Sequence, residues 1–338
     1  MLLSVQRINR NGHMKTNRVL ALASIAAVAL AGQIAQAQQP YPSKPIREVV
    51  PFAAGGPADI LARWLGNKLS PALGQPVIID NKGGAGGLIG AQAVATAPPD
   101  GYTLLFASVG AIAVSPYIAD KVSYDPEKDL IPVVRAVTAP LVLVTATGSR
   151  FNKLADLVSF AKANPGKVTF ASAGIGTTTQ LGAELLMREA GINMVHVPYK
   201  GAAPAITDVL AGTADVLFAD VPVVLPYVKS GKLKVLVAGT AARIPTMPDV
   251  PTTAEAGFPN VIVSTWYGVL APAKTPRESI MKFNAAVNTI LASQEAQTFY
   301  AQQGVQINGG TPEEFGAFIK SEQKRWPALA KAAGIKLE

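Results

Sequence analysis

The chain has 338 residues, no cysteine and a formal net charge of +8. Without cysteine it forms no disulfide and carries no thiol chemistry, and its 2 histidines are too few for a zinc site of the cysteine and histidine type. The basic residues are spread along the chain rather than clustered among aromatic residues, so we expect no nucleic-acid partner.

The N-terminus has the pattern of a secretory signal peptide. Basic residues precede an apolar run over 19–31, which is too short to span a bilayer comfortably, and a small-x-small cleavage site follows at 35–37. We expect residues 1–37 to be the signal peptide, with Met14 as the true start and cleavage near Ala37. The mature chain is then predicted to be exported and soluble, because no other segment has the length and apolar character of a membrane span.

Strand-like apolar runs alternate with helical patterns along the mature chain. Strands are expected at 47–52, 76–80, 102–108, 133–138, 141–146, 168–171, 194–198, 215–219 and 233–240. Helices are expected at 58–73, 87–97, 154–164, 178–190, 203–211, 276–293, 296–303 and 312–333. This alternation predicts parallel sheets covered by helices, which is the α/β class.

Two extended apolar stretches, 133–144 and 233–239, bracket a middle block of the sequence. We interpret them as strands that cross between two domains. The predicted domain 1 comprises residues 38–138 and 239–338, and the predicted domain 2 comprises residues 139–238.

Two glycine-containing loops each join a predicted strand to a predicted helix. The first, residues 52–59 (loop 1), contains Gly55 and Gly56, and the second, residues 172–179 (loop 2), contains Gly176. A helix start leaves backbone N–H groups unpaired and carries partial positive charge, so it binds a carboxylate without a basic side chain. Two such starts facing each other would clamp a small anion.

The side chains of these loops leave alternatives open. Asp59 is either a helix-start acid or a partner for a ligand amine, and one of Thr177, Thr178 and Thr179 caps its helix while the others face a carboxylate. Ser108, Asp220 and Trp266 are weaker candidates for the far end of a ligand. Trp266 and its neighbour Tyr267 are either core residues or walls of a pocket.

Two features could suggest catalysis or dinucleotide binding, but we interpret both as structural. His196 lies in a strand-like run, no G-x-S-x-G nucleophile turn accompanies it, and we interpret it as structural. The glycine-rich segment 81–90 fails the dinucleotide-binding spacing, because Ile89 stands where the third glycine belongs. We therefore expect no cofactor, no metal ion and no catalytic residues.

Taken together, the motifs resemble one family along the whole mature chain. It is similar to the Bug-type periplasmic solute receptors of tripartite tricarboxylate transporters. The segments that carry the resemblance are 41–46, 50–59, 74–77, 81–87, 99–105, 171–174, 195–201, 248–252, 255–257, 270–272 and 311–315.

The resemblance implies a type II periplasmic-binding-protein fold, in which two α/β domains close around a ligand. It implies that loop 1, which carries Phe52 to Asp59, and loop 2, which carries Ser172 to Thr179, grip a ligand carboxylate. It also implies delivery of an organic acid to one large and one small integral membrane subunit. We expect the receptor itself to be a monomer.

The sequence departs from the family's pattern near the expected pocket, so ligand identity stays open among dicarboxylates, tricarboxylates and aromatic acids. The departures are Ala53-Ala54, Pro57-Ala58, Thr179-Gln180 and the segment 107–110. Two alternatives also stay open: a sensory receptor that presents its bound form to a sensor kinase, and an exported hydrolase. The hydrolase would need a nucleophile and a base.

Overall fold

The structure, a computed structural model, describes residues 40–337. The predicted signal peptide, its cleavage site at Ala37 and the predicted start at Met14 lie outside the described residues. The chain from Lys44 onward forms one compact unit, and the fold below is that of this unit.

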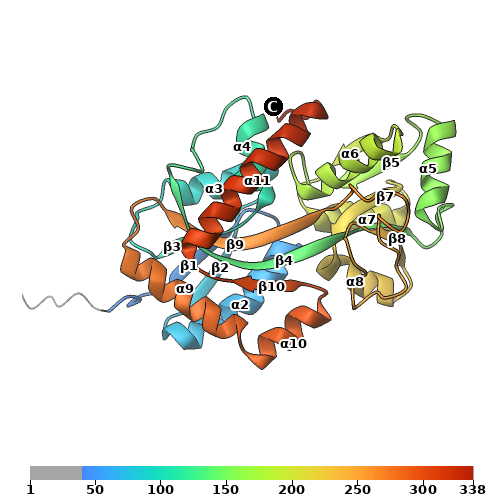
Figure 1. Ribbon diagram of the computed structural model, residues 1–338. Helices are drawn as coiled ribbons and strands as arrows, with labels where there is room; N and C mark the ends of the chain where they lie inside the picture. Colours follow the sequence, from blue (N-terminus) through green and yellow to red (C-terminus); the bar gives the residue numbers. More distant parts are fainter. Residues whose placement is uncertain (1–39, 338) are drawn as a thin grey trace, which may run out of the picture. The chain divides into compact units, whose positions relative to one another are not determined.

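Strands and helices alternate through most of the unit, as Figure 1 shows. The strands are β1 Ile46–Val50, β2 Val77–Asn81, β3 Thr103–Ser108, β4 Leu130–Ala146, β5 Thr169–Ser172, β6 Val195–Pro198, β7 Val216–Asp220, β8 Leu233–Ala238, β9 Ser264–Pro272 and β10 Gln306–Gly309. The helices are α2 Pro57–Leu73, α3 Leu88–Ala95, α4 Ser115–Ile118, α5 Leu154–Ala163, α6 Thr178–Ala190, α7 Ala202–Ala211, α8 Val221–Lys229, α9 Arg277–Leu291, α10 Gln294–Gln302 and α11 Pro312–Ala332, with a 3₁₀ turn η1 Ala85–Gly87 and a π turn η2 Gly110–Val114.

The described strands join into a 10-stranded sheet that is mixed rather than parallel. β2, β1 and β3 run parallel in one group, and β6, β5 and β7 run parallel in another. β4 pairs antiparallel with β7, β8, β9 and β10, and β9 pairs antiparallel with β3. The predicted α/β class is confirmed, whereas the expectation of parallel sheets alone is wrong for the strands around β4.

β4 is one continuous strand of 17 residues, where two shorter strands were predicted. It exchanges partners in its middle, because Pro140 is opposite Ser264 of β9 and Leu141 is opposite Asp220 of β7. Proline has no N–H to donate to a neighbouring strand. A sheet tolerates proline at a position such as Pro140, where the strand changes its pairing partner. The exchange lies next to the predicted boundary at 138/139, and β8 ends at Ala238 beside the predicted boundary at 238/239. The division into two domains itself stays a prediction.

Sequence reasoning missed α8, β9 and β10. Pro222 and Pro226 in α8 are typical helix breakers, yet Pro222 lies in the first turn, where a helix needs no N–H donor. β9 is buried along nearly all of its length. It therefore lacks the alternation of apolar and polar residues that marks a half-buried strand.

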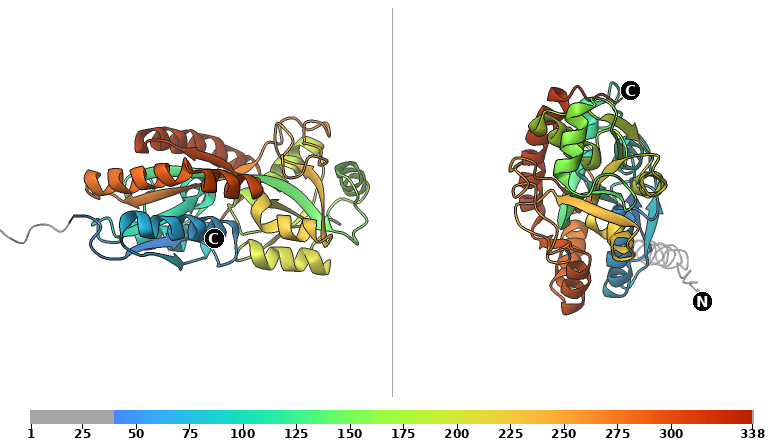
Figure 2. Two further views of the ribbon diagram at one scale, coloured as in Figure 1. Left: turned by 90° about the horizontal axis from the view of Figure 1, so that it is seen from below. Right: turned by 90° about the vertical axis from the view of Figure 1, so that its right-hand side faces the viewer.

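Helices cover the sheet on more than one side. α9 and α11 pack on β4, and α2 packs on β2 and on α9 (Figures 1 and 2). Trp64 of α2 stacks on Phe299 of α10, with ring centroids 4.6 Å apart. Within residues 40–337, no helix combines the length and the apolar character that crossing a membrane requires.

One core position carries an unexpected charge-bearing group. Glu48 lies in the middle of β1, is 0% exposed, and neither of its carboxyl oxygens has a hydrogen-bond partner among the described residues. Burial raises the pKa of Glu48 to about 8. The folded protein therefore favours the uncharged acid at neutral pH.

Replacing Glu48 by Gln keeps the shape of the side chain and removes its titration. The pKa of Glu48 in the folded protein lies above its ordinary value of 4.5. The protonated side chain therefore contributes fully to the free energy of unfolding below about pH 4.5, and this contribution is lost as the pH rises toward 8. We expect urea unfolding to show wild-type stability falling relative to Glu48→Gln between about pH 5 and 8, by on the order of 1 kcal/mol per pH unit. The exposed control Glu278→Gln should follow the wild type. A constant difference between wild type and Glu48→Gln would contradict this account.

Candidate functional site

A small cavity lies at the carboxyl ends of β1, β3, β5 and β7, the edge at which open α/β sheets bind ligands. Its volume is about 30 Å³. The predicted residues that line it are Phe52, Gly56, Ser108, Thr177, Thr178, Thr179 and Asp220. Its other lining residues are Ala53, Pro57, Ala58, Gly110, Ala173, Ala202, Thr265 and Tyr267.

Loops 1 and 2 meet at this cavity, so the structure brings both predicted helix starts to one place. The first turns of α2 and α6 line it, as does Ala202, the first residue of α7. Among the described hydrogen bonds, the backbone N–H groups of Ala58, Thr178 and Thr179 have no partner, as expected for the first turn of a helix. These N–H groups and the positive ends of the helix dipoles favour an anion.

Loop 1 is held by hydrogen bonds that differ from the predicted arrangement. The Gly55 N–H donates to Asp59 Oδ2 at 3.0 Å, and Arg63 Nε pairs with Asp59 Oδ1 at 2.9 Å. Asn81 Nδ2 donates to the carbonyl oxygen of Phe52 at 3.1 Å. The Gly55 N–H is therefore occupied within the loop, and Asp59 does not line the cavity.

The charge of Asp59 is accounted for within its own helix. Burial opposes ionisation of this carboxyl, but hydrogen bonds from Arg63, Gly55 and Asn81 outweigh burial and lower the pKa of Asp59. Of the two alternatives for Asp59, the structure supports the helix-start acid.

Loop 2 uses its hydroxyl groups mainly to fold itself. Thr177 occupies the N-cap of α6 without a capping hydrogen bond, and its Oγ1 donates to the Gly174 carbonyl oxygen at 2.6 Å. The Ala173 N–H donates to Thr179 Oγ1 at 2.8 Å. The Gly176 N–H donates to Gln180 Oε1 at 2.9 Å. The Gly176 N–H is thus engaged within the loop, and Gly176 does not line the cavity.

Gly176 has a conformational reason to be glycine. Its φ is +77°, and a Cβ at this position would lie 2.8 Å from Ser115 Oγ. A side chain would therefore strain the backbone and clash with Ser115. The role of Gly176 is to shape loop 2 rather than to offer its own N–H.

Polar side chains from β7, β9 and α6 meet at one wall of the cavity. Tyr267 Oη donates to Asp220 Oδ1 at 3.1 Å, and the hydroxyl oxygens of Thr178 and Thr265 are 2.5 Å apart. Asp220 is 3% exposed. Burial raises the pKa of Asp220 to about 7, although hydrogen bonds from Thr265 and Tyr267 favour its charged form.

Trp266 faces the other side of β9. Its ring packs edge-on against Phe315 and Phe318 of α11, with centroids 5.4 Å and 6.1 Å away, and it does not line the cavity. Successive side chains of a strand point to opposite faces, so Thr265 and Tyr267 reach the cavity while Trp266 belongs to the core. Of the two residues that the sequence left open between core and pocket wall, Tyr267 is the one that lines the cavity.

The buried Ser172 and the half-buried His196 form a hydrogen-bonded pair. Ser172 Oγ lies 2.6 Å from His196 Nε2, and the His196 ring stacks on Phe170 at 4.7 Å. Burial lowers the pKa of His196 to about 4. Ser172 is 0% exposed and does not line the cavity. A nucleophile must reach its substrate, so this pair links β5 to β6 rather than forming an active site.

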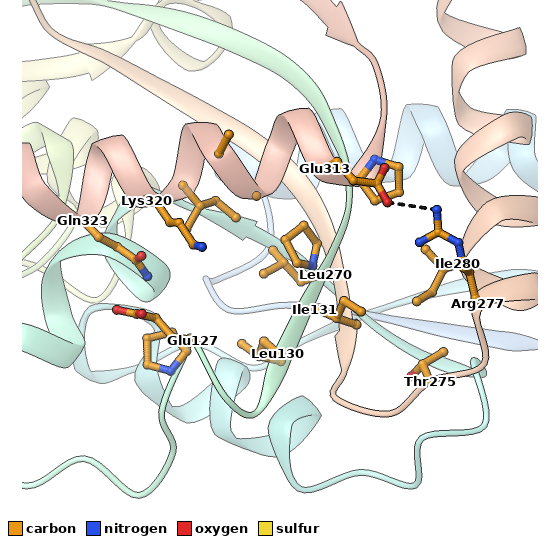
Figure 3. Close-up of a pocket in the computed structure, with 16 residues that line it drawn as sticks. Glu127, Leu130, Ile131, Leu270, Thr275, Arg277, Ile280, Glu313, Lys320 and Gln323 are labelled. Atoms are coloured by element: carbon orange, nitrogen blue, oxygen red, sulfur yellow. Dashed lines mark ion pairs between the residues drawn. The ribbon is translucent and has the colours of Figure 1, made fainter.

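A larger pocket, of about 730 Å³, lies beside β4, β9, α9 and α11 (Figure 3). Its walls are largely apolar, as at Leu130, Leu270 and Ile280, and Arg277 pairs with Glu313 at 3.0 Å on its border. It contains none of the predicted residues and lies beside antiparallel strands. We place the candidate site in the smaller cavity, because the unpaired N–H groups of two helix starts there favour an anion. The larger volume of the other pocket does not by itself indicate a ligand.

Within residues 40–337, no group of three or more histidine, aspartate or glutamate side chains is placed to hold a metal ion.

Comparison with known proteins agrees with this geometry. Residues 61–335 match the family model described as "Tripartite tricarboxylate transporter family receptor". The chain is 37% identical to Protein BugT of Bordetella pertussis over 327 residues, which cover 96% of this chain and 100% of BugT.

Solved structures with bound acids share the fold. The structure "R. palustris Rpa4515 with adipate" matches with a TM-score of 0.85 and 33% identity, covering 88% of this chain and 99% of that one. The structure "MatC (Rpa3494) from Rhodopseudomonas palustris with bound malate" matches with a TM-score of 0.81 and 32% identity, covering 86% and 99%. Because the family model and BugT both match most of the sequence, the chain belongs to the tripartite tricarboxylate transporter receptor family, as a Bug-type member with an α/β periplasmic-binding-protein fold.

Proposed function

We propose that the mature protein is a periplasmic receptor that captures a small organic carboxylate between loops 1 and 2 for a tripartite tricarboxylate-type transporter. The observation that carries this proposal is the meeting of two helix starts with unpaired N–H groups at one cavity. No lysine, arginine or histidine lines that cavity. An anion there is held by oriented backbone dipoles and by hydroxyl groups.

The geometry modifies the roles that we expect for individual residues. We assign the carboxylate contacts to the N–H groups of Ala58, Thr178 and Thr179 and to the Thr178 hydroxyl. Gly55, with a φ of +77°, lets the backbone of loop 1 turn, Gly56 lines the cavity at the N-cap of α2, and Phe52 supplies an apolar wall. Gly55, Gly176, Asp59 and Ser172 support the two loops from outside the cavity.

Dicarboxylates are the first candidates for the ligand. The titles of two related structures name adipate and malate, which are both dicarboxylates. Most of the lining residues are apolar or glycine, and this composition also suits the body of an aromatic acid. A screen of both classes is therefore warranted.

The cavity must open before an acid can enter. A single water molecule needs about 10–15 Å³ of such space, so a cavity of about 30 Å³ has room for very few atoms. We propose that the middle of β4 and the end of β8 act as the hinge between the two predicted domains, and that the described structure represents the closed form. Closure around the acid would then give the membrane partner a recognisable shape.

The cellular role follows from the family and from the signal sequence. We propose export by the signal peptide of residues 1–37, binding as a monomer without catalysis, and transfer of the acid to one large and one small integral membrane subunit. Uptake of the radiolabelled acid by cells should be lost on deletion of this gene. Restoration by the mature protein without an intact signal would contradict a periplasmic role.

A thermal-shift and calorimetry screen of refolded, ligand-free mature protein tests the ligand class. An acid at about 100 times its dissociation constant should stabilise the fold by about 2.7 kcal/mol and raise the melting temperature by about 4 °C. We expect a response to at least one mono-, di- or tricarboxylate and none to the matching amides or alcohols. An unchanged melting temperature with every acid, and no binding heat in calorimetry, would contradict the proposed function.

Placing a negative charge at the cavity wall tests the position of the site. Ala53 lines the cavity and is only half-buried, so Ala53→Asp and Ala53→Asn should both fold. We expect Ala53→Asp to weaken acid binding by about tenfold or more relative to Ala53→Asn, because only aspartate repels a carboxylate. Equal affinities in calorimetry for the two variants would move the site elsewhere.

Small-angle X-ray scattering tests the opening. We expect the ligand-free protein to have a larger radius of gyration than the protein saturated with the acid found in the screen, since the cavity as described is too small for an acid. The variant Ala53→Asp, at the same acid concentration, serves as the control and should stay expanded. Identical scattering with and without bound acid would contradict closure.

A further inference from the structure

Asp220 is an acidic residue in a cavity that we propose to bind anions. It lines the cavity, is 3% exposed, and no basic side chain lines the same walls. An ionised carboxylate at this position repels the carboxylate of a ligand, and burial strengthens that repulsion. A receptor for simple carboxylates would be served better by a neutral residue.

Helix capping does not account for Asp220. The residue occupies the N-cap of α8, where aspartate is favoured because its side chain accepts from the first-turn N–H groups. Here the side chain makes no capping hydrogen bond. It is directed instead to the hydroxyl of Tyr267, which lines the same cavity.

The neighbours of Asp220 leave it with capacity to accept. A carboxylate has lone pairs for about four hydrogen bonds. Tyr267 donates one of them at 3.1 Å, and the Thr265 hydroxyl and the backbone N–H of Asp220 itself supply two more, which leaves about one position for a further donor. Thr265 is at the same time hydrogen-bonded to Thr178. A donor that enters the cavity would therefore find an acceptor that is already fixed in place.

We infer that Asp220 receives a hydrogen-bond donor of the ligand, a hydroxyl or an amino group. The receptor then prefers a carboxylate that carries such a donor over the same carbon skeleton without it. This inference rests on the proposed function, and it names the substrate class as hydroxy or amino carboxylates. The helix starts bind the carboxylate, and Asp220 selects the substituent.

Matched pairs of acids test this preference by calorimetry at one pH and salt concentration. The pairs are malate and succinate, lactate and propionate, aspartate and succinate, and 2-hydroxyglutarate and glutarate. In each pair that binds, we expect the acid with the hydroxyl or amino group to bind at least about tenfold more tightly. The acid without that group would leave the buried Asp220 carboxylate without a hydrogen-bond donor, which costs binding free energy. Comparing malate with aspartate distinguishes a hydroxyl from an amino group.

The variant Asp220→Asn keeps the size of the side chain, removes its negative charge and adds an N–H₂ donor. The asparagine side chain can therefore lie beside an acid that has no hydroxyl or amino group. We expect the preference within each pair to fall to about threefold or less. Asp208→Asn is the matched control: Tyr199 Oη donates to Asp208 Oδ2 at 2.6 Å, but the pair does not line this cavity. This control should keep the wild-type preference.

A second variant protects the test if Asp220→Asn does not fold. Tyr267→Phe removes a donor from Asp220 and should keep or increase the preference. Equal affinities within every binding pair of the wild type, or an unchanged preference in a folded Asp220→Asn, would overturn the inference and leave the carboxylate receptor intact. Failure of every acid to bind would overturn both.

Discussion

The binding chemistry that we propose depends on backbone N–H groups that the helices cannot satisfy internally. Each helix start leaves such groups unpaired, and the sheet brings the starts of α2 and α6 to one edge because parallel strands end there together. The site therefore needs no cationic side chain. The same constraint explains why the residues of loops 1 and 2 serve mainly to fix the backbone.

Much of this arrangement could be predicted from the sequence. Glycines between an apolar run and a helical pattern marked both loops, and the helix expected at 58–73 begins within one residue of α2. The α/β class followed from the alternation of strands and helices. These features are local, because they depend on the conformation of neighbouring residues and on strand and helix periodicity.

The features that the sequence did not reveal depend on contacts between distant segments. The N–H groups of Gly55 and Gly176 were expected to face the ligand, but Asp59 and Gln180 engage them. Trp266 was a weaker candidate for the far end of the ligand, left open between core and pocket wall, and the phase of β9 turns its ring toward α11. Tyr267 lines the candidate cavity because β9 lies beside β3 and β4, a pairing that no local pattern indicates.

A crystal structure of the protein with the tightest-binding acid tests the central claim most directly. The account predicts one ligand carboxylate between the first turns of α2 and α6, within about 3.2 Å of the N–H groups of Ala58, Thr178 or Thr179, directly or through one water. The account would be contradicted by an acid in the larger pocket beside α9 and α11. A carboxylate held mainly by a lysine or arginine side chain would contradict it equally.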